Sequence, residues 1–117
     1  MRILLADDQT NVRFALRTLL NSQPGIIVVG EAQDAHILLD TLHDLHPDLV
    51  LLDWGLPGIK SEELIASIQS FYPELAIIVL SGRFEVKRDA EAAGADRFIS
   101  KADPPGDLLA AIYSLTI

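Results

Sequence analysis

The run Asp48-Leu-Val-Leu-Leu-Asp53, followed directly by Trp-Gly-Leu-Pro-Gly58, decides how this chain folds. Its four apolar residues form a short, uninterrupted segment that ends in a carboxylate and a turn. Continuous rather than alternating hydrophobicity is typical of a strand that is covered on both faces, as parallel strands are when helices cross over on each side. The stretch therefore predicts a central strand of a parallel sheet, with Asp53 at its carboxyl end.

Short apolar runs with similar boundaries recur along the chain, at residues 3–6, 26–29, 76–80 and 97–99. Apolar residues at helical spacing lie between and after these runs, within residues 12–20, 38–45, 64–68, 86–93 and 108–112. A strand-helix unit repeated five times predicts a doubly wound α/β sheet. Gly25 and Gly94 follow two of the helical stretches, where we expect a left-handed cap.

Length and composition limit the possible functions. The 117 residues, half of them hydrophobic, are enough for one core, so we expect a single domain over residues 1–117. A net charge of -8 argues against direct contact with nucleic acid. The lack of cysteine excludes disulfides and thiolate zinc sites. We find neither a leader peptide nor an apolar stretch long enough to span a membrane, so we expect a soluble cytoplasmic domain without membrane contact.

Polar side chains stand at the ends of four of the predicted strands. Asp7 and Asp8 follow the first strand, Asp53 ends the third, Ser81 follows the fourth and Lys101 follows the fifth. In a doubly wound sheet, ligands bind outside the carboxyl ends of the strands. Three acids, a hydroxyl and an amine at that edge predict a site for phosphoryl transfer.

The chemistry expected there follows from charge. Three carboxylates held together repel one another unless a cation is present, and Mg²⁺ prefers carboxylate oxygens while leaving room for a phosphate oxygen. Asp53 would attack phosphorus and form an aspartyl phosphate. The metal and Lys101 would stabilise charge on the phosphoryl oxygens, and the hydroxyl of Ser81 would donate to one of them.

Four segments together resemble the receiver domain of two-component response regulators: Leu5-Ala-Asp-Asp8, Leu52-Asp-Trp-Gly-Leu-Pro-Gly58, Leu80-Ser-Gly82 and Gly94-Ala-Asp-Arg-Phe-Ile-Ser-Lys101. The resemblance covers the whole chain, and it is greatest to receivers that precede a helix-turn-helix DNA-binding domain. It implies a flavodoxin-like fold in which a five-stranded parallel sheet has the order 2-1-3-4-5 and carries five helices.

The resemblance also implies roles for the polar residues. Asp53 would accept a phosphoryl group from a phosphohistidine of a sensor histidine kinase or a histidine phosphotransfer protein. Asp8 would bind Mg²⁺ directly and Asp7 through a water molecule, with Asp53 and the backbone carbonyl of Gly55 as further ligands. Self-association as a homodimer upon phosphorylation is a further expectation from the family.

Ser81 and Phe98 would form the switch pair of such a receiver. The phosphoryl group would draw the hydroxyl inward, and the aromatic ring would follow into the vacated space. Phe98 has no hydroxyl, so its inward state would depend on ring packing alone. Two departures affect the loops: Ala102 follows Lys101 where many receivers have proline, and Arg83 is placed to shield the phosphoryl group or pair with it.

Two other functions fit the sequence less well. A magnesium phosphohydrolase would need a second acid two positions after a nucleophile on the first strand, and that position is Gln9. An interaction domain that has lost the chemistry would be expected to lack one of the site residues. Singly, the acids could be turn or cap residues; together, at successive strand ends, they favour the phosphoacceptor site.

The remaining polar and aromatic residues have simpler interpretations. His36, His43 and His46 could be zinc ligands, but no set of carboxylates or thiolates completes a site, so a solvated helix face is favoured. We expect Trp54 at the rim of the site. Four further aromatic residues at helical spacings are expected to pack on the core: Phe14, Phe71, Tyr72 and Tyr113.

Overall fold

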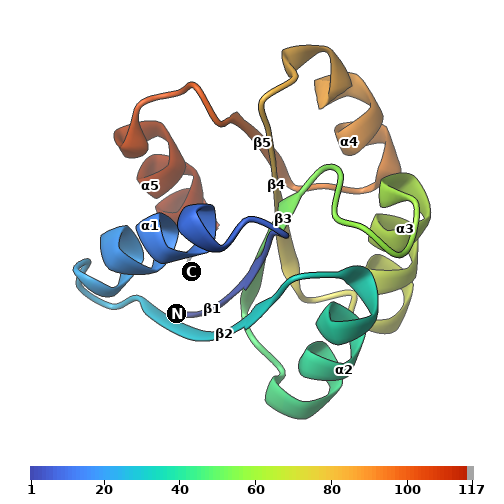
Figure 1. Cartoon of the computed structure of the whole chain (residues 1–117), viewed down its shortest axis with the longest axis horizontal. Coiled ribbons are helices and arrows are strands. Elements are labelled where there is room, and N and C mark those ends of the chain that lie inside the picture. Colours follow the sequence, from blue (N-terminus) through green and yellow to red (C-terminus); the bar gives the residue numbers. More distant parts are fainter. Residues whose placement is uncertain (116–117) are drawn as a thin grey trace.

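The computed structural model describes residues 1–115, which form one five-stranded parallel sheet between two layers of helices (Figure 1). The strands are β1 (Arg2–Ala6), β2 (Ile27–Ala32), β3 (Leu49–Asp53), β4 (Ala76–Ser81) and β5 (Arg97–Ser100). Their order in the sheet is β2-β1-β3-β4-β5, which confirms the predicted topology.

Within residues 1–115, five α-helices connect the strands and follow the last one, also as predicted. They are α1 (Thr10–Asn21), α2 (Ala35–Leu45), α3 (Ser61–Phe71), α4 (Lys87–Ala93) and α5 (Pro105–Ser114), and a short 3-10 turn, η1 (Phe84–Val86), precedes α4. None of these helices has the length and apolar character needed to cross a membrane.

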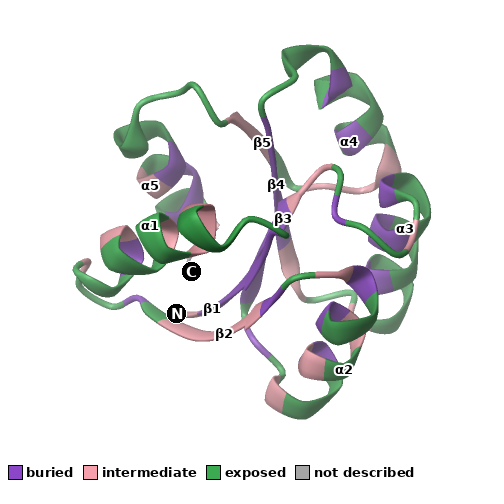
Figure 2. Ribbon diagram, in the orientation of Figure 1, coloured by how far each residue is buried: buried purple, intermediate pink, exposed green. Residues whose placement is uncertain are grey.

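The two faces of β3 show why its sequence is continuously apolar. Leu49 and Leu51 pack with α1 and α5, whereas Val50 and Leu52 pack with α2, α3 and α4. All four are buried, and Figure 2 shows the buried residues concentrated in the strands and on the inner sides of the helices. Because helices cover both faces, no position along the strand needs to be polar until Asp53.

The second strand continues past its predicted end at residue 29. Its pairing with β1 shifts register between Ile3 and Leu4, so that Val28 and Gly30 are matched and Val29 is skipped. A Cβ atom on Gly30 would come within 2.9 Å of a methyl group of Leu45. Glycine at this position lets α2 pack closely against the strand, and reading it as the end of the strand was wrong.

The predicted helix caps are partly correct. Gly94 caps α4 with a φ of +120°, as expected. Gly25 also has a positive φ, but α1 ends earlier and its cap is Ser22 in a right-handed conformation. The residue that caps α2 in the left-handed conformation is His46, which the sequence did not indicate.

The aromatic predictions were wrong for Phe14 and Phe71, which are 71% and 77% exposed. Phe14 lies two residues from Val12 and from Leu16, and this spacing turns it away from the half-buried side of α1. Tyr72 packs against the core, as expected. Tyr113 is 43% exposed, and its hydroxyl donates to the carbonyl of Pro24 at 3.1 Å.

Candidate functional site

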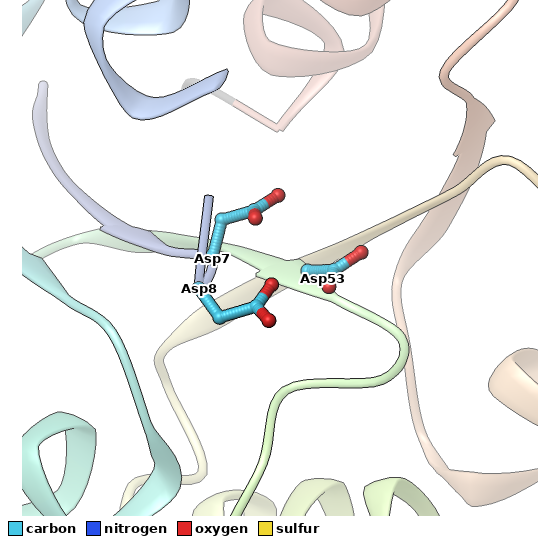
Figure 3. A group of neighbouring side chains, drawn as sticks. All are labelled: Asp7, Asp8 and Asp53. Atoms are coloured by element: carbon cyan, nitrogen blue, oxygen red, sulfur yellow. The ribbon is translucent and has the colours of Figure 1, made fainter. Parts of the chain in front are cut away.

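Three carboxylates meet where β1 and β3 end (Figure 3). The parallel register sets Ala6 opposite Leu52, so Asp7 and Asp8 leave the sheet at the level of Asp53. Ligand oxygens of the three aspartates all lie within 4.8 Å of one another. Asp7 is buried, Asp53 is half-buried and Asp8 is exposed, so the group is open to solvent on one side.

Lys101 reaches this group from the end of β5. The pairing of β4 with β5 places Ser81 opposite Ser100, and the Lys101 backbone N–H donates to the Ser81 carbonyl at 2.8 Å. The Lys101 ammonium lies 2.9 Å from Asp7 Oδ2 and 2.9 Å from Asp53 Oδ1. The peptide bond after Lys101 is trans, as is usual where no proline follows.

The electrostatics of the site reflect an excess of negative charge. Burial raises the pKa of the Asp53 carboxyl, Asp7 and Asp8 raise it further, and the hydrogen bond from Lys101 opposes them only in part. Burial alone would lower the pKa of Lys101, but hydrogen bonds to Asp7 and Asp53 outweigh it and the pKa is raised. The single positive charge of Lys101 is shared by two acids, so three ionised carboxylates would still leave an excess of two negative charges.

The donor set fits a hard divalent cation. Carboxylate oxygens are the ligands that Mg²⁺ prefers, and an exposed side to the group leaves room for the waters that this ion retains. Both oxygens of Asp7 already accept hydrogen bonds, from the Gln9 N–H and from Lys101. The Asp8 carboxylate accepts none from residues 1–115 and is the freest ligand. Gly55 lies beside the group, since a Cβ there would be 4.0 Å from Asp53 Oδ2.

Comparison with known proteins supports what the geometry indicates. The sequence profile described as the response regulator receiver domain matches residues 3–113 of this chain. The chain belongs to the response-regulator receiver family. Receivers are regulators in two-component systems rather than enzymes that turn over a separate substrate.

Individual relatives agree with this assignment. The nitrate/nitrite response regulator NarL of Escherichia coli K12 is 33% identical over 113 residues, which are 95% of this chain and 52% of NarL. The chain therefore spans about half the length of the curated relatives it matches. Others include transcriptional regulators, such as YxjL of Bacillus subtilis at 32% identity over 115 residues, 96% of this chain and 52% of that protein.

Solved structures of receivers superpose closely on this one. RcsB from Salmonella enterica serovar Typhimurium, bound to the rprA promoter in the presence of the phosphomimetic BeF3-, has a TM-score of 0.92 and 28% identity over 98% of this chain and 59% of its own. The response regulator domain of Thermotoga maritima CheB has a TM-score of 0.86 at 24% identity, covering 100% of this chain and 97% of its own, and it supports the fold alone.

The two residues expected to act as a switch lie on neighbouring strands of the receiver. The Ser81 hydroxyl is buried and its oxygen accepts from the Arg83 N–H at 3.0 Å, which leaves its own proton free to be donated. Phe98 is half-buried and its ring meets that of Phe84 edge to face, with 6.2 Å between ring centroids. The Arg83 guanidinium pairs with Glu85 at 3.1 Å.

The other candidate residues occupy different places in the receiver. Trp54 is half-buried against the core beside Asp53, at the rim expected from the sequence. His43 and His46 lie at the end of α2, where the His46 ring meets that of Tyr72, and neither belongs to the cluster of three aspartates. Within residues 1–115, the only clustered set of potential metal ligands is the three aspartates.

Sequence reasoning missed two residues near the site. Phe84 is 67% exposed and covers Phe98, and its position three residues after Ser81 gave no sign of this contact. Arg13, in the first turns of α1, donates from Nη1 to the Asp7 carbonyl at 2.7 Å. The sequence does place a basic residue, Arg13, six positions after Asp7. Its contact with the Asp7 carbonyl could not be predicted from that spacing, because its side chain is also held by Glu31 of β2.

Proposed function

We propose that this receiver is a phosphorylation switch in which Asp53 is the phosphoacceptor. The observation that carries the proposal is the placement of the Lys101 ammonium, 2.9 Å from Asp53 Oδ1 and 2.9 Å from Asp7 Oδ2. A cation held over the nucleophile by a second acid is suited to receive a phosphoryl oxygen. The burial that raises the pKa of Asp53 also leaves its ionised form less solvated and more nucleophilic.

In the proposed reaction an Asp53 carboxylate oxygen attacks the phosphorus of a phosphohistidine. The new P–O bond forms as the P–N bond breaks, and the imidazole nitrogen keeps the electron pair. The Lys101 ammonium moves its hydrogen bond from the carboxylate to a phosphoryl oxygen, where negative charge is concentrated in the transition state. The receiver thus contributes positioning and charge rather than acid-base chemistry.

Asp7, Asp8, Asp53 and the Gly55 carbonyl are the proposed Mg²⁺ ligands, with Asp7 acting through water because both of its oxygens are already bonded. Bound Mg²⁺ would neutralise the carboxylates and polarise a phosphoryl oxygen. Lys101 alone cannot balance three acids, so the site has an electrostatic reason to take up a divalent ion.

Ser81 and Phe98 are the proposed relay from the phosphoryl group to the surface. The Ser81 proton is available for donation to a phosphoryl oxygen, and movement of this hydroxyl would free space next to β5. Phe98 would follow, breaking its edge-to-face contact with the exposed ring of Phe84. The change would then be readable on the surface formed by η1, α4 and β5.

The proposed partners follow from family membership. A sensor histidine kinase or a histidine phosphotransfer protein would supply the phosphoryl group in the cytoplasm, and phosphorylation would promote homodimer formation. We propose that residues 1–117 act as a receiver unit that does not itself touch nucleic acid, since its net charge is -8. Loss of the phosphoryl group by self-catalysed hydrolysis would reset the switch.

Intact mass spectrometry tests the proposal. Incubation with Mg²⁺ and acetyl phosphate should add one phosphoryl group to the wild-type chain and none to Asp53→Asn. Repeating the incubation with BeF3- in place of acetyl phosphate, and following the fluorescence of Trp54, separates a short-lived phosphoryl group from an inert site. A chain that gives neither an adduct nor a fluorescence change would be an interaction domain without phosphoacceptor chemistry.

A further inference from the structure

Arg13 links the edge strand β2 to the peptide group that joins the two neighbouring acids. Its side chain is 13% exposed, and its Nε donates to Glu31 Oε1 at 2.9 Å. Its Nη1 donates to the Asp7 carbonyl at 2.7 Å. A planar guanidinium can make both bonds at once because its donors point in fixed directions, which an ammonium cannot reproduce.

The orientation of the Asp7 carbonyl also determines where Asp8 lies. The atoms of one peptide group lie in a plane, so fixing the carbonyl oxygen of Asp7 also fixes the direction in which the chain enters Asp8. The Asp8 carboxylate has no hydrogen bond or ion pair within residues 1–115 that would orient it independently. Its position beside Asp53 therefore depends on the backbone, and the backbone at this point is held by Arg13.

Other contacts hold the N–H and the side chain of Asp7, whereas Arg13 is the residue that bonds to the carbonyl of the Asp7–Asp8 peptide group. The Asp7 N–H donates to the Ala32 carbonyl at 3.0 Å, and its side chain is bonded to Gln9 and Lys101. The start of α1 adds little, since its N-cap residue Gln9 makes no side-chain capping bond. Strand β2 thus holds Asp7 at both sides, at the N–H through Ala32 and at the carbonyl through Glu31 and Arg13.

We propose that Arg13, oriented by Glu31, is a positioning residue that sets the Asp7–Asp8 peptide so that both carboxylates can share one divalent cation. The inference rests on the proposed function, since it assumes that the cation is Mg²⁺. Groups that orient metal ligands from outside typically change affinity by about 10- to 100-fold when they are removed. We expect a loss near the lower end, about tenfold, because Lys101 and Gln9 still hold the Asp7 side chain.

The direction in which Mg²⁺ affinity changes when Arg13 is replaced distinguishes a positioning role from a purely electrostatic one. Removing a positive charge from the edge of an acidic pocket would by itself tighten the binding of a cation. Arg13→Gln should instead weaken it, because the Asp7 carbonyl loses its donor and the peptide can turn. The dissociation constant for Mg²⁺ is read from the fluorescence of Trp54, which lies next to Asp53, and from isothermal calorimetry.

Arg17 supplies the matched control. It also pairs with Glu31, through the other carboxylate oxygen, but makes no contact with Asp7. Arg17→Gln therefore removes an equal charge from the same ion-pair group and should leave the Mg²⁺ dissociation constant within about twofold of wild type. Melting temperatures of both variants in EDTA report any general loss of stability.

The outcomes are distinct. A wild-type chain that does not bind Mg²⁺ overturns the proposed metal site together with this inference. A wild-type chain that binds Mg²⁺, with Arg13→Gln binding it equally well or more tightly, or with both variants weakened alike, overturns the positioning role alone. Should Arg13→Gln fail to fold, Arg13→Lys takes its place. Lysine keeps the positive charge but cannot donate to Glu31 and to the Asp7 carbonyl in the same fixed directions. This variant must weaken Mg²⁺ binding for the inference to stand.

Discussion

Aspartates at the two ends of the sheet meet very different surroundings. At the amino end, Asp48 Oδ2 accepts from the Arg2 N–H and Asp96 Oδ2 accepts from the Ile77 N–H, each at 2.8 Å. Each of these acids completes the hydrogen bonding near a strand start, and neither belongs to a cluster of three potential metal ligands within residues 1–115. At the carboxyl end, Asp7, Asp8 and Asp53 lie together, and Asp7 and Asp53 share the ammonium of Lys101.

The difference separates the acids that bond to strand backbone from the acids that gather at the proposed site. An acid whose oxygen accepts a backbone N–H has a hydrogen-bond partner and in turn satisfies that N–H. A group of acids with too few partners stores repulsion that a cation or a phosphoryl group can relieve. We therefore expect the carboxyl end of the sheet, and not the amino end, to respond to a cation or a phosphoryl group.

The largest expected effect is the response to Mg²⁺. At about one hundred times its dissociation constant, an ion that binds only the folded state adds about 2.7 kcal/mol to the free energy of unfolding. Urea denaturation with and without Mg²⁺ measures this gain. Asp8→Ala should lose most of it and Asp48→Ala should keep it; an equal response in the two variants would remove the distinction between the ends.

The next largest expected effect is the decrease in the free energy of unfolding when Lys101 is replaced. Lys101→Met leaves two partly or fully buried carboxylates without their shared donor, which we expect to cost about 2 kcal/mol in EDTA. Mg²⁺ should restore most of this loss, since it replaces one cation with another, while the response to acetyl phosphate stays weak. The readout is the free energy of unfolding measured in both buffers.

Arg2 provides the comparison at the amino end. Its guanidinium donates to the carbonyls of Leu45 and His46 at 2.7 and 2.8 Å, where α2 ends. Arg2→Met should also destabilise the chain, by about 1 kcal/mol, because these carbonyls lose a donor. Added Mg²⁺ should give Arg2→Met only the increment that wild type receives. A larger increment would mean that the metal acts at both ends.

The fold could be predicted from sequence because burial on both faces leaves a direct mark on composition. The run Leu49–Asp53 has no polar residue before its last position, and the same signal marked the other strands. The edge where the acids meet followed from topology, since parallel strands end together. Gly30 shows what local sequence does not reveal: a glycine there suggests a strand boundary, whereas its reason is the packing of Leu45, which lies on another element.

The contacts within the site could be predicted less well than its location. Strand ends brought Asp7, Asp53 and Lys101 to one edge, but sharing of one ammonium between two acids depends on side-chain conformations. The turn of Arg13 toward the Asp7 carbonyl depends on Glu31, which lies on a strand 18 residues away along the chain. Such contacts arise from the meeting of distant segments and have no local pattern.

The smallest predicted effect concerns the charge of Asp53 in the absence of metal. Burial raises its pKa above the ordinary value of 3.8, so the folded state holds the proton more tightly than the unfolded state does. Stability therefore falls as pH rises from 3.8 through the folded pKa, and the loss persists at neutral pH. Asp53→Asn removes this loss. In EDTA at pH 7 it should be more stable than wild type by about 1 kcal/mol, as is common when functional repulsion is relieved.

Asp48→Asn makes the comparison sharp, because it is the same substitution at the other end of the same strand. The amide oxygen of asparagine can accept the Arg2 N–H as the carboxylate does, so the free energy of unfolding should stay within about 0.5 kcal/mol of wild type at neutral pH. The gain in Asp53→Asn should vanish in denaturation curves taken below pH 3.8, where wild-type Asp53 is also neutral. If Asp48→Asn gained as much as Asp53→Asn, the benefit would come from lowering the overall charge of -8, and the carboxyl end would hold no special store of repulsion.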